Sequence, residues 1–145
     1  MWVSIINNSE KCIQNILKET KNIAVVGASS KPERDSYVVM QALINSGFNI
    51  FPVNPNEIGN TILGQKCYSS LTSIKESIDM VDIFRNSDAV IDITKEAIEI
   101  KAKVIWMQLN IVNLKAKSIA VNAGLKVVMN KCPKQELEKL YWTLD

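Results

Sequence analysis

The residues best suited to chemistry follow the first apolar run of the chain, residues 23–26. The turn Gly27-Ala28-Ser29 comes next, and a predicted helix begins a few residues later. Basic and hydroxyl-bearing side chains stand between the turn and the helix, at Lys31, Arg34, Ser36 and Tyr37. A buried strand, a glycine turn and a new helix N-terminus are together typical of a site for phosphate groups. We therefore predict a phosphorylated ligand here, with Arg34 holding a pyrophosphate through paired hydrogen bonds.

Each residue of this turn also has a purely structural explanation. Gly27 is compatible with a tight turn that only reverses the backbone. Lys31 and Arg34 are compatible with solvated surface charges. Ser36 is expected to cap the helix, whether or not a ligand binds.

Further candidate residues follow the other predicted strands, at Asn54 and Pro55, Phe84 and Arg85, Gln108 and Asn113, and Cys132. Phe84 suits either the flat face of a base or the core, and Arg85 suits a ligand contact or a surface salt bridge. Gln108 ends a buried strand and needs a hydrogen-bond partner, which the protein or a ligand can supply. Asp79 and Asp82 flank the third strand and are expected at the surface or as caps.

Histidine and cysteine usage limits the chemistry. The chain has no histidine, which excludes Ser-His-Asp and Cys-His catalysis and any histidine metal site. The cysteines, Cys12, Cys67 and Cys132, form no CxxC pair. This pattern indicates a reduced, cytoplasmic protein without disulfides or a metal.

Length and composition predict one domain spanning residues 1–145, with a helix from residues 1–20 packed on it. Hydrophobic residues make up 47% of the chain and charged residues 22%, as in soluble globular proteins. The net charge of +2 gives no argument for nucleic acid. No apolar run approaches the roughly 18 residues that span a bilayer, and no signal peptide is recognisable. We expect neither a nucleic-acid partner nor a membrane.

Strand-like runs alternate with helical periodicity along the chain. Strands are predicted at residues 22–26, 49–53, 80–84, 103–109 and 126–129. Helices are predicted at residues 9–19 (capped by Asn8 or Ser9), 36–46, 87–101 and 113–123, and from Pro133 onward. This alternation predicts an α/β fold, a Rossmann-like five-stranded parallel sheet of order 3-2-1-4-5 with helices on both faces. The ligand is expected where the order reverses, between the first and fourth strands.

The fingerprint of nicotinamide dinucleotide sites is incomplete. G-x-G-x-x-G keeps only its first glycine, because Ser29 and Pro32 occupy the other two positions. The second strand also lacks the terminal acidic residue that holds a ribose, and the P-loop pattern is absent. The loop and its cations instead suit an adenine nucleotide that carries more than one phosphate.

The chain resembles the stand-alone CoA-binding proteins, whose Rossmann-like domain is related to the CoA-binding part of succinyl-CoA synthetase. The matching blocks run in order from about Lys21 to Leu140. They are residues 24–29, 31–34, 36–37, 52–55, 63–68, 81–85, 106–109 and 128–134. The chain departs from the family pattern at Asn110, where the family has glycine, at Asn130, where it has aspartate, and at Leu137, where it has histidine. Asparagine is the next choice after glycine for a left-handed backbone.

The resemblance implies coenzyme A as the ligand, with its pyrophosphate near Gly27, Ala28, Ser29 and the helix that starts at Ser36. It implies that Lys31 and Arg34 neutralise phosphates. Asn54, Pro55, Phe84 and Arg85 would border the adenosine, and the thiol arm would run toward Gln108, Asn113 and Cys132. Cys132 is either simply buried or able to form a mixed disulfide with the CoA thiol.

We therefore interpret the chain as a non-catalytic module that binds coenzyme A or an acyl-CoA, with a protein partner or homo-oligomer left open. One alternative is a detached subunit of an NDP-forming acyl-CoA synthetase, although the histidine that such ligases phosphorylate is missing. Another is a nicotinamide-dinucleotide sensor, against which the incomplete fingerprint counts. The sequence does not choose between free CoA and an acyl-CoA.

Overall fold

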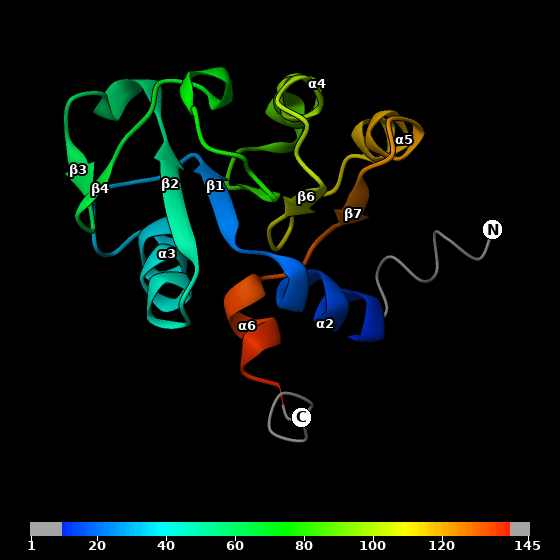
Figure 1. Cartoon of the computed structure of the whole chain (residues 1–145), viewed down its shortest axis with the longest axis horizontal. Coiled ribbons are helices and arrows are strands. Elements are labelled where there is room, and N and C mark those ends of the chain that lie inside the picture. The colour runs from blue at the N-terminus through cyan, green and yellow to red at the C-terminus, as the bar shows by residue number, and fades with distance from the viewer. Residues whose placement is uncertain (1–9, 140–145) are drawn as a thin grey trace.

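The computed structural model describes residues 10–139. Its main sheet has five parallel strands in the order β2-β1-β5-β6-β7 (Figure 1). These strands are β1 (Asn22–Val26), β2 (Asn49–Val53), β5 (Met80–Ile83), β6 (Val104–Met107) and β7 (Lys126–Val128). The helices are α2 (Glu10–Glu19), α3 (Asp35–Asn45), α4 (Val90–Glu99), α5 (Leu114–Asn122) and α6 (Pro133–Leu137). The caps predicted for the first helix, Asn8 and Ser9, lie outside the described residues.

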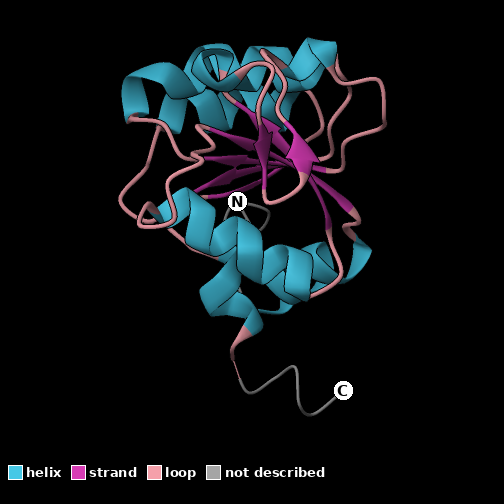
Figure 2. Ribbon diagram, turned by 90° about the vertical axis from the view of Figure 1, so that its left-hand side faces the viewer, coloured by secondary structure: helices cyan, strands magenta, loops and turns pink. Residues whose placement is uncertain are grey.

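Helices cover both faces of the sheet, which confirms the predicted α/β Rossmann-like class. Figure 2 shows the sheet between two helical layers, with α4 and α5 on one side and α2, α3 and α6 on the other. Side chains of β1 alternate between the layers, because successive residues of a strand point to opposite faces. Ile23 and Val25 join the core beneath α2 and α3, and Ala24 and Val26 join the core beneath α4 and α5. Burial on both faces explains the continuous apolar runs of the sequence.

The predicted strand order 3-2-1-4-5 is wrong. Counted along the chain, the five strands lie in the order 2-1-3-4-5, because β5 pairs with β1 and leaves β2 at the edge. Pro52 lies in β2, and proline has no N–H to donate to a neighbouring strand, so an edge position suits it. The point where the order reverses is therefore between β1 and β5.

The connection from β2 to β5 contains no long helix. It holds a small antiparallel pair, β3 (Thr61–Ile62) and β4 (Gln65–Lys66). Short 3-10 turns stand at Pro55–Glu57 and Leu71–Ser73. A third such turn, Ser87–Ala89, precedes α4, so this helix begins later than predicted.

None of the helices described between residues 10 and 139 has the length and apolarity needed to cross a bilayer. In the same part of the chain, no cluster of three or more metal-ligating side chains is found.

Candidate functional site

The site begins where two neighbouring loops touch. Gly27 follows β1 and Phe84 follows β5, and Phe84 N–H donates to the carbonyl of Val26 at 2.8 Å. Gly27 has a φ of +89°, and a β-carbon there would lie 2.6 Å from the carbonyl oxygen of Phe84. Only glycine allows this approach. The phosphate-binding turn predicted from the sequence is therefore held against the loop that carries Phe84 and Arg85.

The first amides of the turn hold it to the end of β2. Gly27 N–H and Ala28 N–H both donate to the carbonyl of Val53, at 3.0 and 3.3 Å. The side-chain amide of Asn54 donates to the carbonyl of Ala28 at 2.8 Å, and its oxygen accepts from Asn56 N–H at 2.9 Å. Asn54 thus positions the turn as well as lining the space beside it.

The next amides donate to side chains. Ser29 N–H donates to the hydroxyl of Ser36 at 3.1 Å, and Lys31 N–H donates to the hydroxyl of Ser29 at 3.1 Å. The hydroxyl and N–H of Ser30 donate to the Glu57 carboxylate at 2.7 and 3.0 Å, and these bonds hold the pKa of Glu57 below its usual range. Ser36 does not cap α3 as predicted, because the helix begins one residue earlier and the Ser36 hydroxyl holds the turn instead.

Free backbone donors lie in the first turn of α3. Within residues 10–139, no group accepts from the amides of Asp35, Ser36 and Tyr37, and Arg34 at the N-cap position makes no side-chain cap. The first amides of a helix lack intrahelical partners and carry the positive end of its dipole. This N-terminus of an 11-residue helix is therefore suited to an anion.

A first cavity of about 710 Å³ opens beside this helix N-terminus, at the carboxyl ends of β1 and β2. Most of the predicted binding residues line it, namely Gly27, Ala28, Ser29, Lys31, Arg34, Asn54, Pro55, Phe84 and Arg85. Its volume is within the usual range for ligand sites. The structure thus brings together residues from the loops after β1, β2 and β5.

Charge around the first cavity favours an anionic ligand. Lys31, Arg34 and Arg85 are exposed on its wall, and none of them forms a salt bridge within the described part of the chain. Glu96 from α4 also lines the cavity, but its carboxylate accepts from the N–H and hydroxyl of Thr72, both at 3.3 Å. The cations of the wall therefore remain available to phosphate groups.

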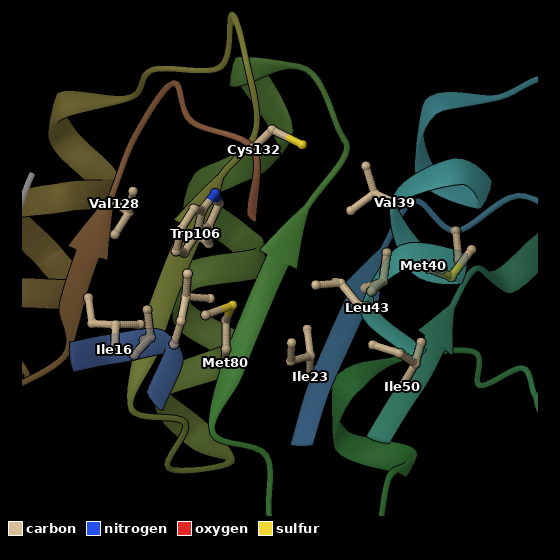
Figure 3. Close-up of a cluster of buried hydrophobic side chains, with 14 of the residues drawn as sticks. Ile16, Ile23, Val39, Met40, Leu43, Ile50, Met80, Trp106, Val128 and Cys132 are labelled. Carbon is tan, nitrogen blue, oxygen red and sulfur yellow. The ribbon is translucent and has the colours of Figure 1, made fainter. Parts of the chain in front are cut away.

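A second cavity of about 530 Å³ lies on the other side of the α3 N-terminus. Phe84 and Arg85 line both cavities, so the two are adjacent and share this loop as a wall. Gln108 and Cys132, both predicted from the sequence, line the second cavity together with Val39 of α3. Figure 3 shows Cys132 and Val39 at the carboxyl end of the strands.

Gln108 has a buried partner that the sequence did not suggest. Asp82, expected at the surface or as a cap, is fully buried in the middle of β5. The Gln108 side-chain amide faces this carboxyl, and with its nitrogen turned toward the carboxyl it donates to the two oxygens at 3.0 and 3.3 Å. Burial raises the pKa of Asp82 well above its ordinary value. Asp79 is partly buried and accepts from the N–H groups of Lys21 and Asn22, in agreement with the capping role.

Three predicted residues line neither cavity. Ser36 is buried beneath the turn, and Tyr37 is half-buried against the core below α3. Asn113 caps α5 by accepting from Ala116 N–H at 2.9 Å, and its side-chain nitrogen donates to the carbonyl of Ser87 at 2.8 Å. We leave the side chains of Tyr37 and Asn113 out of the proposed contacts.

The three cysteines are buried and free of disulfides. Burial raises the pKa of Cys12 and of Cys67, and neither lines the first or second cavity. Trp106 is fully buried, and its indole N–H donates to the carbonyl of Lys131 at 2.8 Å, next to Cys132.

The departures from the family pattern have a local explanation. Asn110 and Asn130 both have a left-handed backbone, with φ of 68° and 59°. The side-chain oxygen of Asn130 accepts from Asn110 N–H at 2.7 Å. The expectation that asparagine replaces glycine in a left-handed position is confirmed at Asn110, and the hydrogen bond joins the loops after β6 and β7.

Some residues that line the two cavities were not predicted from the sequence. Ser69 and Ser70 complete the first cavity, and Asp35 and Val38 line the second. The Tyr68 backbone bridges to Val53 at the end of β2, which explains why Ser69 and Ser70 lie beside the carboxyl edge. No motif in the sequence marks that bridge.

A third cavity, of about 480 Å³, lies at the opposite, amino edge of the sheet. Four of its five charged lining residues form ion pairs with one another, because Lys103 is 3.5 Å from Asp79 and Lys126 is 3.8 Å from Glu19. The cavities at the carboxyl edge, with unpaired cations and free helix amides, are the better candidates for the functional site.

Comparison with known proteins identifies the family of this chain. A family model described as a CoA binding domain matches residues 21–138. The "Uncharacterized protein YneT" of Bacillus subtilis is 39% identical over 128 residues, which cover 88% of this chain and 93% of that protein. The solved structure of a hypothetical protein from Pyrococcus horikoshii OT3 superimposes with a TM-score of 0.88 at 40% identity, covering 94% of this chain and 95% of that chain.

Similarity extends to part of a larger enzyme. The alpha subunit of acetate–CoA ligase (ADP-forming) I from Pyrococcus furiosus is 34% identical over 89 residues. The match covers 59% of this chain but only 19% of that subunit. The chain therefore corresponds to one part of the ligase subunit.

Proposed function

The chain belongs to the CoA-binding domain family, as its motifs predict, and we propose that it binds coenzyme A as a single domain without catalysing a reaction. The observation that carries the proposal is the first turn of α3, whose free amides are flanked by two adjacent cavities. Coenzyme A has a matching order of parts, with a pyrophosphate between a phosphorylated adenosine and a pantetheine arm.

Each part of the ligand has suitable residues. The amides of Asp35, Ser36 and Tyr37 and the side chain of Arg34 would hold the pyrophosphate, because helix N-termini and guanidinium groups both favour phosphate oxygens. The phosphorylated adenosine would occupy the first cavity, beside Asn54, Pro55 and Lys31. The pantetheine arm would pass Phe84 and Arg85 into the second cavity and end near Gln108 and Cys132. The bound cofactor would supply a thiol.

A binding role is supported by the state of the acidic groups near the cavities. Glu57 accepts two hydrogen bonds from Ser30, and Glu96 accepts two from Thr72. Asp82 is buried against Gln108. Acidic groups with such structural partners hold the walls of the cavities in place, which suits a preformed binding site.

Isothermal titration calorimetry with coenzyme A tests the proposal. We expect one CoA per chain, and a thermal stabilisation that corresponds to about 2.7 kcal/mol when CoA is at 100 times its dissociation constant. ATP and NADH serve as competitors. Tighter binding of NADH than of CoA would favour the dinucleotide sensor, and neither heat nor a melting shift at millimolar CoA would refute the proposal.

A second candidate function is a detached subunit of an acyl-CoA ligase, which the similarity to the Pyrococcus furiosus ligase subunit favours. Such a subunit would need a partner that binds ATP. Affinity purification from cells tests this candidate, since it predicts stoichiometric co-purification of an ATP-dependent partner whose acyl-CoA synthesis requires this chain.

A further inference from the structure

Exposed apolar side chains gather around the mouth of the second cavity. Val38 of α3 is 44% exposed and Leu109 is 42% exposed, and both line this cavity. Val112 and Leu114 follow closely along the chain and are also exposed. Large apolar side chains grouped beside a cavity mark a surface that a ligand or partner covers.

The interior of the same cavity is also partly apolar. Val39 and Cys132 are buried in its wall, and Phe84 and Ile111 are half-buried there. Gln108 supplies a polar group, and its side-chain nitrogen faces Asp82. An apolar wall with a few polar groups is the usual composition of a small-molecule site.

The wall that the second cavity shares with the first indicates what would cover this surface. Phe84 and Arg85 line both cavities, and Arg34 and Asp35 place the first turn of α3 between them. A pyrophosphate on that turn would direct the pantetheine arm, and whatever its sulfur carries, into the second cavity.

We propose that the second cavity receives the acyl group of an acyl-CoA, so that the preferred ligand is a thioester with a short, uncharged apolar chain rather than free coenzyme A. This inference rests on the proposed CoA site. The charged side chains of the cavity argue against an acidic acyl group: Asp35 is itself negative, and Lys134 is bonded to Glu138 at 2.9 Å. Arg85 is shared with the pyrophosphate region.

The first test is a calorimetric series of CoA, acetyl-CoA, butyryl-CoA, hexanoyl-CoA and octanoyl-CoA. Each methylene that becomes buried should tighten binding by roughly fourfold until the cavity is filled. The heat-capacity change on binding should become more negative along the series. Succinyl-CoA, which matches butyryl-CoA in length but ends in a carboxylate, should gain nothing over CoA.

A matched pair of variants locates the effect. Val38→Thr combined with Leu109→Asn should reduce the affinity for hexanoyl-CoA about tenfold and leave that for CoA within about twofold, by loss of apolar contact. The control is Val121→Thr, because Val121 is a helical valine that is 37% exposed and lines neither cavity. This exchange should change neither the CoA affinity nor the hexanoyl-CoA affinity.

The outcomes separate this inference from the proposed function. The acyl site is overturned, and the CoA site preserved, if CoA binds tightly and the acyl chain adds no affinity. The same conclusion follows if the acyl chain adds affinity that the exchanges at Val38 and Leu109 leave unchanged. Failure of both CoA and acyl-CoA to bind overturns both. The inference is also overturned if the wild-type protein is a dimer, these exchanges convert it into a monomer, and the acyl-CoA affinity does not change. The apolar surface would then contact a second copy of the chain.

Discussion

Gly27 and Phe84 lie so close that a β-carbon on Gly27 would be 2.6 Å from the Phe84 carbonyl oxygen and 3.2 Å from the δ-carbon of Arg85. This approach joins the loops after β1 and β5, the two strands between which the strand order reverses. It gives Gly27 a structural role that needs no ligand. It also places Arg85 beside the turn that precedes α3.

Replacement of Gly27 by alanine should therefore destabilise the protein through two effects. The left-handed φ of +89° disfavours alanine by roughly 1–2 kcal/mol, and the clash with backbone of Phe84 adds to this. Gly124→Ala is the matched control, because Gly124 has a φ of +90° and no atom within 4 Å of its would-be β-carbon. Urea denaturation should show the larger loss for Gly27→Ala, and equal losses would contradict the close contact.

The two arginines should contribute to ligand affinity through charge. Arg34→Ala and Arg85→Ala should each weaken CoA binding about tenfold or more, since hydrogen bonds to charged groups contribute roughly 1.5–3 kcal/mol. The loss should be larger at low salt, because salt screens exposed charges. Lys115→Ala on α5, which lines neither cavity, is the control. Calorimetry at two salt concentrations decides, and an unchanged affinity in the double variant would remove both residues from the site.

Asp82 should make the protein less stable as pH rises. Because burial raises its pKa in the folded state above the ordinary 3.8, the folded state binds more protons than the unfolded state at pH values above 3.8. The stability linked to Asp82 is thus fully present below that pH and is lost as pH rises. Asp82→Asn should be more stable than wild type near pH 7, and the difference should shrink toward about pH 4.

Asp79 provides the opposite case for the same measurement. Burial of its carboxyl is outweighed by the N–H groups of Asn22 and Lys21 and by the Lys103 ammonium, so its pKa is lowered. Its contribution is present above the ordinary 3.8 and is lost as pH falls. Asp79→Asn should therefore be less stable than wild type at neutral pH, with a deficit that shrinks in acid. Denaturation curves in which both variants follow the same pH trend would contradict these assignments.

Cys132 should be the cysteine whose modification the bound ligand slows. It lines the second cavity, whereas Cys12 and Cys67 lie elsewhere and have pKa values raised by burial. Burial lowers the thiolate fraction of Cys12 and Cys67 by raising their pKa, so iodoacetamide should modify them slowly, whereas the second cavity gives the reagent a route to Cys132. Saturating CoA should slow the modification of Cys132 alone, as measured by peptide mass spectrometry. Equal protection of all three would indicate general stabilisation instead of a local contact.

The sequence predicted the layers and strands of the fold but not the order of its strands. Alternating runs and periodic segments identified all strands of the main sheet, because burial on both faces leaves a continuous apolar signal. The side of β1 on which β5 pairs depends on the long connection after β2, which has no helix to mark its path. Pro52 carried a usable signal, since proline places β2 at an edge and is incompatible with the interior position predicted for it.

The site could be predicted to the level of loops. Residues directly after β1, β2 and β5 gather as expected, because the carboxyl ends of parallel strands meet at one edge. The hydrogen-bond partners of a side chain depend on packing that no motif encodes, so Ser36 was predicted to cap a helix and Asp82 to lie at the surface or form a cap. The exposure of Val38 could not be predicted either, because an apolar residue on an amphipathic helix is expected in the core. In the structure its side chain is 44% exposed.

The most direct measurement is the response of the α3 amides to coenzyme A in a nitrogen–proton NMR titration. The account predicts that the largest shifts fall on the amide protons of Asp35, Ser36 and Tyr37, which gain phosphate acceptors, with smaller shifts at Phe84 and Cys132. The amides of Gly27 and Ala28, already bonded to Val53, should shift less. Binding that leaves the α3 N-terminus unperturbed, or that shifts the amino-edge residues Lys103 and Lys126 instead, would contradict the account.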